Sequence, residues 1–373
     1  MRLLEHAYTD VVEEFKYDSD NEQYNMEYLQ WRRESDSKLV FRFSENNLES
    51  FYVQGDAAAK QDAGLAERSA LMHCAQAVGA ALLLFFLTAM AGESLLNAIL
   101  RLFGIDMHMD FLLITMKGSQ WAVVAARAVL MLLKYLLPAC LLIKLGKLPR
   151  RIFAPVSAGS IPEFSAGVGA GMVIAGIFAL ISQKEGIELA QSIISYKDTA
   201  AVVAYGIFNT LIASAAAELF LRGTVLMLLR QFGDPFAVAA TALIAFLFPN
   251  EMPDRICELL IGLAAGYLMI RAGSLPKCIT LRIVYTGLSY ARLVAVYNNM
   301  GRKLMLWEYS LLLISLGTLA LAFFVMVRRH SLPMSNRRII LSNGQKFSAF
   351  MQTVTVLPWV AVSVLLMLVQ MFF

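Results

Sequence analysis

The sequence predicts an all-α fold: a polytopic membrane protein with about nine transmembrane helices and a small cytosolic N-terminal segment. Of the 373 residues, 58% are apolar and only 16% are charged, whereas a soluble chain carries about 25% charged residues. The mean hydropathy is +0.61, and the apolar residues gather in runs long enough to cross a bilayer. Residues 1–69 hold 15 acidic and 8 basic side chains, a net charge of −7, so residues 70–373 carry +11. These observations divide the chain into an acidic N-terminal segment, 1–69, and a helical membrane domain, 70–373.

The acidic segment 1–69 is expected to lack a signal peptide, because Met1 is followed by a mixed, acidic stretch and not by a basic and then an apolar region. Alternation of apolar and polar residues predicts short strands at 38–43 and 50–54, and 56–71 is predicted as a helix that leads into the membrane. The aromatic residues of this segment favour either a small core of their own or a docking arm for a cytosolic partner at residues 1–69. The sequence leaves both interpretations open.

Nine apolar runs in the membrane domain approach the length of about 20 residues that a spanning helix needs. The run at 255–271 is short, and the run at 202–229 is long enough to tilt. The predicted spans are 71–91, 120–143, 165–183, 202–229, 235–250, 255–271, 277–297, 308–327 and 350–372.

Basic residues flank these predicted spans asymmetrically. With residues 1–69 in the cytosol, the inner connections carry 12 basic and two acidic residues, and the outer connections carry 7 basic and 9 acidic residues. Because cytoplasmic loops hold the excess of Lys and Arg, we expect the N-terminus inside and the C-terminus outside, most simply in the cytoplasmic membrane. The lipid bilayer is therefore an expected partner. Nucleic acid is not, because the basic residues border apolar runs and form no patch with aromatic residues.

Several ionisable residues lie inside the predicted spans, where a charge costs a few kcal/mol unless it is paired or hydrated. Glu218 and Arg222 are four residues apart, so they share one helix face and can neutralise each other. An ion pair that holds the helix in place and a role in handling a proton or a substrate both remain open. When the charges at the span ends are counted with the connections, seven remain: Arg127, Lys134, Glu218, Arg222, Glu258, Arg282 and Arg292.

Three short motifs in one part of the membrane domain resemble those of a known family. Ala217–Gly223 (AELFLRG) resembles the Glu-Glu-x-x-x-Arg-Gly motif of the CPBP family, the CAAX-processing and bacteriocin-processing intramembrane proteases. Phe246–Asn250 (FLFPN) resembles that family's Phe-x-x-x-His, and Arg271–Pro276 resembles the turn that precedes the third motif. The third motif, His-x-x-x-Asn in the family, falls on Arg282–Thr286. The resemblance identifies residues 199–297 as a CPBP-like core.

The resemblance implies an intramembrane endopeptidase in which the first Glu and the first His activate water, while the second His and the Asn hold the oxyanion. The first Glu is here Ala217 and the first His is Asn250, so neither water-activating residue is present. Of the family's charged motif residues, only two are present here: the second Glu, Glu218, and the arginine, Arg222. The motif positions are Ala217, Glu218, Arg222, Phe246, Asn250, Arg282 and Thr286.

The replacement residues are poor catalysts by their own chemistry. Hydrolysis of a peptide needs a base that reaches water and a donor for the oxyanion. Asn250 cannot accept a proton at neutral pH, and Arg282 does not deprotonate in proteins. The four histidines lie outside the spans or at their edges, and no HExxH or Cys/His cluster occurs. We therefore expect no metal and no cofactor, and a catalytically degenerate chain.

Three functions follow from this sequence. The first is a pseudoprotease that binds a peptide or a membrane-protein partner in the former protease cavity. The second is an active protease with displaced chemistry, in which Glu218 is the base. The third is a transporter or channel component in which Glu218, Arg222, Glu258 and Arg282 line a hydrated path, although no internal repeat supports it.

Two geometric expectations accompany these hypotheses. Glu218 and Asn250 should face each other across a helical hairpin that turns near Gly233, because both lie roughly 22–26 Å along a helix from that turn. Arg282 joins them only if the turn at 274–276 is sunk into a cavity open to the cytosol. In addition, small residues at 166–171 and 262–266 predict close helix packing.

Overall fold

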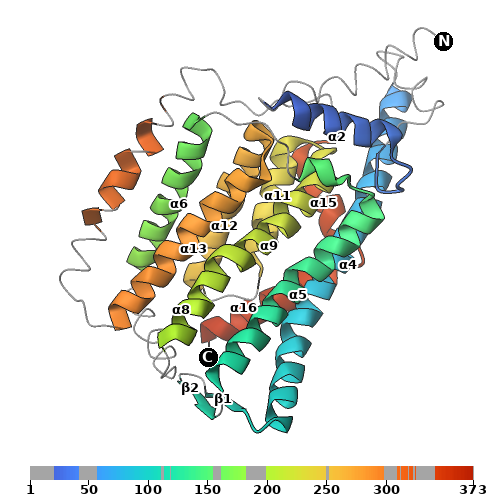
Figure 1. The fold of residues 1–373 in the computed structure, drawn as a ribbon. Helices are drawn as coiled ribbons and strands as arrows, with labels where there is room; N and C mark the ends of the chain where they lie inside the picture. Colours follow the sequence, from blue (N-terminus) through green and yellow to red (C-terminus); the bar gives the residue numbers. More distant parts are fainter. Residues whose placement is uncertain are drawn as a thin grey trace.

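The computed structural model of the chain describes residues 21–41, 57–110, 113–117, 119–153, 161–181, 199–248, 252–297, 309–310, 312–317, 319–321, 324 and 341–372. Long helices lie side by side in a bundle, and one shorter helix crosses its end (Figure 1). The fold is helical, as predicted.

The elements carry the labels of Figure 1. Three of them, η1, η2 and η3, are short 3-10 or π-helical stretches. In chain order they are α2 (Glu22–Glu34), α4 (Ala57–Leu102), β1 (Asp106–Asp110), β2 (Leu113–Lys117), α5 (Gln120–Gly146), η1 (Arg150–Ile152), α6 (Ile161–Ile181), α8 (Thr199–Ile207), η2 (Phe208–Ala213), α9 (Ser214–Glu218), η3 (Leu219–Leu226), α10 (Met227–Arg230), α11 (Asp234–Phe246), α12 (Met252–Ala272), α13 (Leu275–Tyr297), α15 (Asn343–Met351) and α16 (Val356–Phe372).

Three helical stretches among the described residues are long and apolar enough to cross a membrane: Gly64–Leu102, Gln120–Gly146 and Val203–Arg230. Asn343–Met351 and Val356–Val369 would add a fourth span if that bent pair crosses as one. Helical residues overlap all nine predicted runs, but the other helices are too short or too charged to qualify on their own. Helix α12 holds Asp254, Arg255, Glu258 and Arg271, and α13 holds Lys277, Arg282 and Arg292. Two of these residues, Glu258 and Arg282, meet in the site described below.

The predicted run 350–372 is not one straight helix. Its first two residues are the end of α15, and from Val356 onward it forms α16; the axes of these two helices differ by 85°. Pro358 lies in the first turn of α16, where a residue without a backbone N–H is tolerated because that N–H would have no helical partner. The loop before α16 also packs tightly, since a Cβ on Gly79 of α4 would lie 2.7 Å from the backbone nitrogen of Val356.

One hairpin departs from the all-α prediction. Strands β1 and β2 pair antiparallel, with Met107 opposite Met116, and they connect α4 to α5 at the far end of both helices (Figure 1). The sequence does carry a signal for it, because the residues of β1, DMHMD, alternate between polar and apolar with the period of a strand.

The acidic segment 1–69 differs from its prediction in its first described part. Residues 38–40 form a turn, so the predicted strand at 38–43 is wrong there, and the predicted strand at 50–54 lies outside the described residues. Residues 22–34 form a helix that Asn21 caps, since its side chain accepts a hydrogen bond from the backbone of Tyr24. The predicted helix at 56–71 is confirmed, and it continues unbroken through α4.

The aromatic residues of α2 pack on the bundle and do not form a core of their own. Tyr28 donates a hydrogen bond to the backbone oxygen of Met227 at 3.2 Å, and Trp31 donates one to that of Gly146 at 2.9 Å. Tyr24 and Tyr28 also flank the guanidinium of Arg230, whose carbon lies 5.2 and 5.1 Å from their ring centres. Burial raises the pKa of both phenols, so they stay neutral donors. Helix α2 is thereby fixed across the ends of α5 and α10.

Small residues bring helices into close contact, as 166–171 and 262–266 predict. A Cβ on Gly262 of α12 would lie 2.6 Å from the Cα of Ala242 in α11. A Cβ on Gly171 of α6 would lie 2.6 Å from the backbone oxygen of Leu281 in α13. Because small residues let backbones approach this closely, they fix the position of α12 against α11 and of α13 against α6.

A buried turn joins α12 to α13. Gly273 has a φ of +55°, a conformation that glycine adopts without steric cost, and Ser274 and Lys277 beside it are buried. The side-chain amide of Asn21 donates to the backbone oxygen of Gly273 at 3.2 Å. The turn therefore lies beneath the start of α2 and places α13 alongside α12.

Candidate functional site

Residues 199–230 form a helix whose winding changes along its length. Residues 199–230 are helical throughout, but η2 and η3 have π-helical hydrogen bonding, and the short helix α9 separates them. Stretches of π-helix inside α-helices occur frequently at functional sites. Here Glu218 is the last residue of α9, and Arg222 lies within η3.

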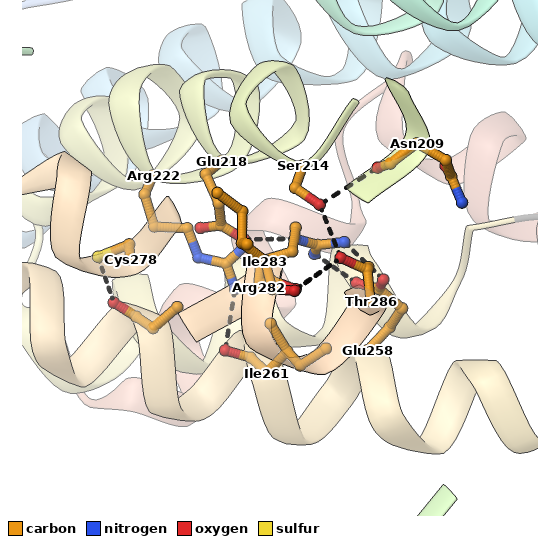
Figure 2. A network of polar contacts seen from close by, with 11 residues as sticks. Asn209, Ser214, Glu218, Arg222, Glu258, Ile261, Cys278, Arg282, Ile283 and Thr286 are labelled. Carbon is orange, nitrogen blue, oxygen red and sulfur yellow. Dashed lines mark hydrogen bonds and ion pairs between the residues drawn. The ribbon is translucent and has the colours of Figure 1, made fainter. Parts of the chain in front are cut away.

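Four charged side chains meet beside this helix, and we call them the charge cluster: Glu218, Arg222, Glu258 and Arg282 (Figure 2). Arg282 Nε lies 2.6 Å from Glu218 Oε1, and the two terminal nitrogens of Arg282 bind the two oxygens of Glu258 at 2.6 and 2.5 Å. Arg222 Nη1 donates to the same Glu218 Oε1 at 3.1 Å. The cluster therefore holds two carboxylates and two guanidinium groups and has no net charge.

Burial makes this pairing obligatory. Glu218 and Arg222 are 0% exposed, Arg282 is 4% exposed and Glu258 is 7% exposed. Charges in such surroundings are stable only when they are paired and hydrogen-bonded. Since Glu258 belongs to α12 and Arg282 to α13, the cluster ties three separate elements of the core together.

A pair of hydroxyl groups extends the polar contacts along the same helix. Ser214 Oγ lies 3.1 Å from Thr286 Oγ1, and Thr286 donates to the backbone oxygen of Arg282 at 2.8 Å. Ser214 also reaches the backbone oxygen of Asn209 in η2 at 3.5 Å. Figure 2 shows these residues next to the charge cluster.

Two polar atoms of the charge cluster have no hydrogen-bond partner among the described residues. They are Glu218 Oε2 and Arg222 Nε, and both are buried. Buried polar atoms without a partner are rare in native proteins and often mark a place for water or a ligand. One is an acceptor and the other a donor.

Several predicted site residues do come together. The ion pair between Glu218 and Arg222 is confirmed, and Arg282 joins it through Glu218. Thr286 reaches the site through Ser214 and the backbone of Arg282.

The remaining predicted positions do not enter the charge cluster. Ala217 is buried beside Glu218 and offers only a methyl group. Phe246 is half-buried at the end of α11, where its backbone oxygen accepts a bond from Arg255 at 3.4 Å. Asn250 lies outside the described residues, so its position opposite Glu218 stays a prediction.

Sequence reasoning missed two members of the site as contacts. Glu258 was predicted as a charge within a span but not as the partner of Arg282, because nothing local relates residues 24 positions apart on different helices. Ser214 was not predicted at all, although it precedes Glu218 by one helical turn and so lies on the same face.

Within the described residues, no group of three His, Cys, Asp or Glu side chains could hold a metal ion. Comparison of the chain with family models, with curated proteins and with solved structures finds no match. The likeness of 199–297 to the CPBP family therefore rests on the motifs alone.

Proposed function

We propose that the chain is a CPBP-like integral membrane protein without peptidase activity, a pseudoprotease that binds a peptide or a membrane-protein partner at its former catalytic centre. The observation that carries this proposal is the state of Glu218. It is the one carboxylate that the first motif keeps, and its Oε1 is held by the guanidinium groups of both Arg222 and Arg282.

Hydrolysis of a peptide requires a base within reach of a water molecule. In the charge cluster, Oε1 of Glu218 is occupied by two donors, and Oε2 is enclosed in the protein. The neighbouring motif position is Ala217, which carries no proton acceptor. The contacts of the charge cluster therefore favour a role in holding helices together over a role in activating water.

The two unfilled polar atoms support binding of a polar partner here. A peptide backbone offers one donor and one acceptor per residue, and Glu218 Oε2 and Arg222 Nε offer one of each. Both atoms are buried, so a peptide unit reaches them only when the helices around the charge cluster move apart. It would then satisfy both atoms, which otherwise carry the free-energy cost of burial without a partner.

In this proposal the chain crosses the cytoplasmic membrane nine times, with its N-terminus in the cytosol. The overlap of helical residues with all nine apolar runs supports that count, and the pairing of the charges of α12 and α13 supports placing these helices inside the bundle.

We expect no cleavage of prenylated CAAX peptides or bacteriocin leader peptides by the purified protein in proteoliposomes, because the centre lacks an available base. The measurement is peptide cleavage followed by mass spectrometry, with the wild type and Glu218→Gln side by side. Cleavage by the wild type that disappears in Glu218→Gln would establish an active protease and overturn the proposal.

We expect a photo-reactive phenylalanine analogue at Phe246 to cross-link a specific partner in native membranes, and the same analogue at Leu365 to cross-link none. Phe246 is a half-buried motif position, whereas Leu365 of α16 is 60% exposed on the outside of the helix. The adduct should be lost in Glu218→Ala/Arg222→Ala, a double change that keeps the charge cluster neutral. An adduct that persists in this folded variant would contradict binding at the cluster.

A further inference from the structure

A pocket of about 480 Å³ lies away from the charge cluster, between α2 and the connection from α5 to η1. We call it the junction pocket. Its volume lies within the range of about 300–1,000 Å³ that small-molecule sites have. The charged side chains that line it are Glu27, Glu34, Asp36, Lys147, Arg150 and Arg151.

Two backbone oxygens at the end of α5 already accept hydrogen bonds from side chains of this protein. Trp31 donates to the backbone oxygen of Gly146 at 2.9 Å, and Ser37 donates to that of Leu145 at 2.7 Å. These bonds satisfy carbonyl groups that a helix end leaves without partners. A ligand in the junction pocket therefore meets side chains and not the end of the helix.

Charge divides the junction pocket into two walls. The acidic residues belong to α2 and the segment after it, and the basic residues are Lys147 at the end of α5 and Arg150 and Arg151 in η1. Two ion pairs cross between the walls: Lys147 lies 2.5 Å from Asp36, and Arg151 lies 3.6 Å from Glu27. These pairs neutralise two charges on each wall.

One charge on each wall is left over. Glu34 accepts a hydrogen bond from the neutral side chain of Gln30 at 2.9 Å, and among the described residues neither Glu34 nor Arg150 forms an ion pair. Both side chains are exposed. The junction pocket thus presents one carboxylate and one guanidinium group, which is the complement of a ligand with one positive and one negative group.

The position of the junction pocket indicates where such a ligand comes from. It adjoins the C-terminal end of α5, one of the three helices long enough to span the membrane. Lys144, Lys147, Arg150 and Arg151 follow one another there, and basic clusters of this kind lie at the cytoplasmic headgroup level. Phospholipid headgroups are the charged molecules at that level.

We propose that the junction pocket binds an ethanolamine phosphate ester, with its phosphate on Arg150 and its ammonium group on Glu34. The source we expect is the headgroup of an ethanolamine phospholipid. A purely anionic headgroup fits less well, because Glu34 would repel it and Lys147 and Arg151 are already paired. A choline headgroup also fits less well, since a quaternary ammonium donates no hydrogen bond to Glu34, and Trp31 is only 4% exposed and cannot offer its ring face.

The test uses the full-length protein, delipidated in detergent and then mixed with single lipids. Bound lipid is counted by native mass spectrometry with phosphatidylethanolamine, phosphatidylcholine and phosphatidylglycerol in separate arms. A fourth arm adds water-soluble phosphoethanolamine. We expect one tightly held phosphatidylethanolamine, bound about tenfold more tightly than the other two lipids, because one charge-assisted hydrogen bond distinguishes them.

Variants separate the two walls. Glu34→Ala and Arg150→Ala should each weaken binding of phosphatidylethanolamine about tenfold, while Glu22→Ala and Arg33→Ala, which change exposed charges of α2 outside the junction pocket, should not. Since Glu34 and Arg150 are exposed, their variants should melt at the wild-type temperature.

Each outcome decides the proposal. Displacement of the lipid by phosphoethanolamine, or binding of phosphoethanolamine alone, supports the ligand chemistry, and the second result assigns the source to the soluble ester. Equal binding of all three lipids overturns the proposal. So does tighter binding of phosphatidylglycerol, or unchanged binding by both alanine variants. These results do not depend on cleavage or on the cross-linked partner, so the proposed function stands or fails separately.

Discussion

Replacing Arg282 by alanine should lower the free energy of unfolding by about 3–5 kcal/mol, the usual cost of removing one partner from a buried ion pair. Arg282 is 4% exposed and is the group that joins Glu218 to Glu258. Without it, Glu258 loses its ion-pair partner and Glu218 keeps only Arg222. The measurement is equilibrium or thermal unfolding in mild detergent. Arg127→Ala, which removes a partly exposed arginine from the span of α5, is the matched control and should have an effect of less than about 1 kcal/mol.

A double change separates the role of charge balance from the role of packing. Glu258→Gln/Arg282→Gln removes one charge of each sign and leaves the pair of Glu218 and Arg222 intact. We expect it to be more stable than Arg282→Ala, because no unpaired charge remains buried. If the double variant lost as much stability as the sum of its two single changes, the residues would act independently and the charge cluster would not be a unit.

Replacing Gly262 by valine should also have a large effect, at or above the upper end of the 1–3 kcal/mol that overpacking costs. Even a single Cβ would lie 2.6 Å from the Cα of Ala242, and the obstacle is backbone, which cannot rotate away. Helices α11 and α12 would have to separate. The unfolding midpoint in detergent and the yield of folded protein measure the loss.

Two other glycines serve as controls for the loss of stability at Gly262. A Cβ on Gly266 meets only side-chain atoms of Val238, the nearest at 3.0 Å, and Gly344 has nothing within 4 Å. Alanine should therefore be mildly destabilising at Gly266 and neutral or slightly stabilising at Gly344, since alanine favours helix over glycine. Similar losses at Gly262, Gly266 and Gly344 would mean that helix approach does not determine the cost.

Contacts of this site between residues close in the sequence could be predicted, and contacts between distant residues could not. The pair of Glu218 and Arg222 could be predicted because helical spacing alone brings residues four apart together. The close approach of Gly262 to α11 could be predicted because small residues are enriched where membrane helices pack closely. The bond from Arg282 to Glu258 could not, since it depends on the side-by-side placement of α12 and α13, which no local pattern specifies.

The fold shows the same division. Apolar length predicted the helices, but not the break between α15 and α16, where the chain lies against Gly79, far away in the sequence. Helix α2 was missed because its apolar residues, Tyr24, Tyr28 and Trp31, are aromatic residues within a charged stretch. They bind to a surface that only the folded bundle provides.

That dependence has a consequence for biosynthesis. The hydrogen bonds that hold α2 join residues 115, 199 and 252 positions apart: Trp31 to Gly146, Tyr28 to Met227, and Asn21 to Gly273. A ribosome finishes α2 long before it makes any of these partners, and contacts of such long range form late. Trp31 and Tyr28 therefore wait until Gly146 and Met227 have been made, and Asn21 waits until the turn after α12. The last of its bonds to form, from Asn21 to Gly273, then marks a chain whose core is already assembled.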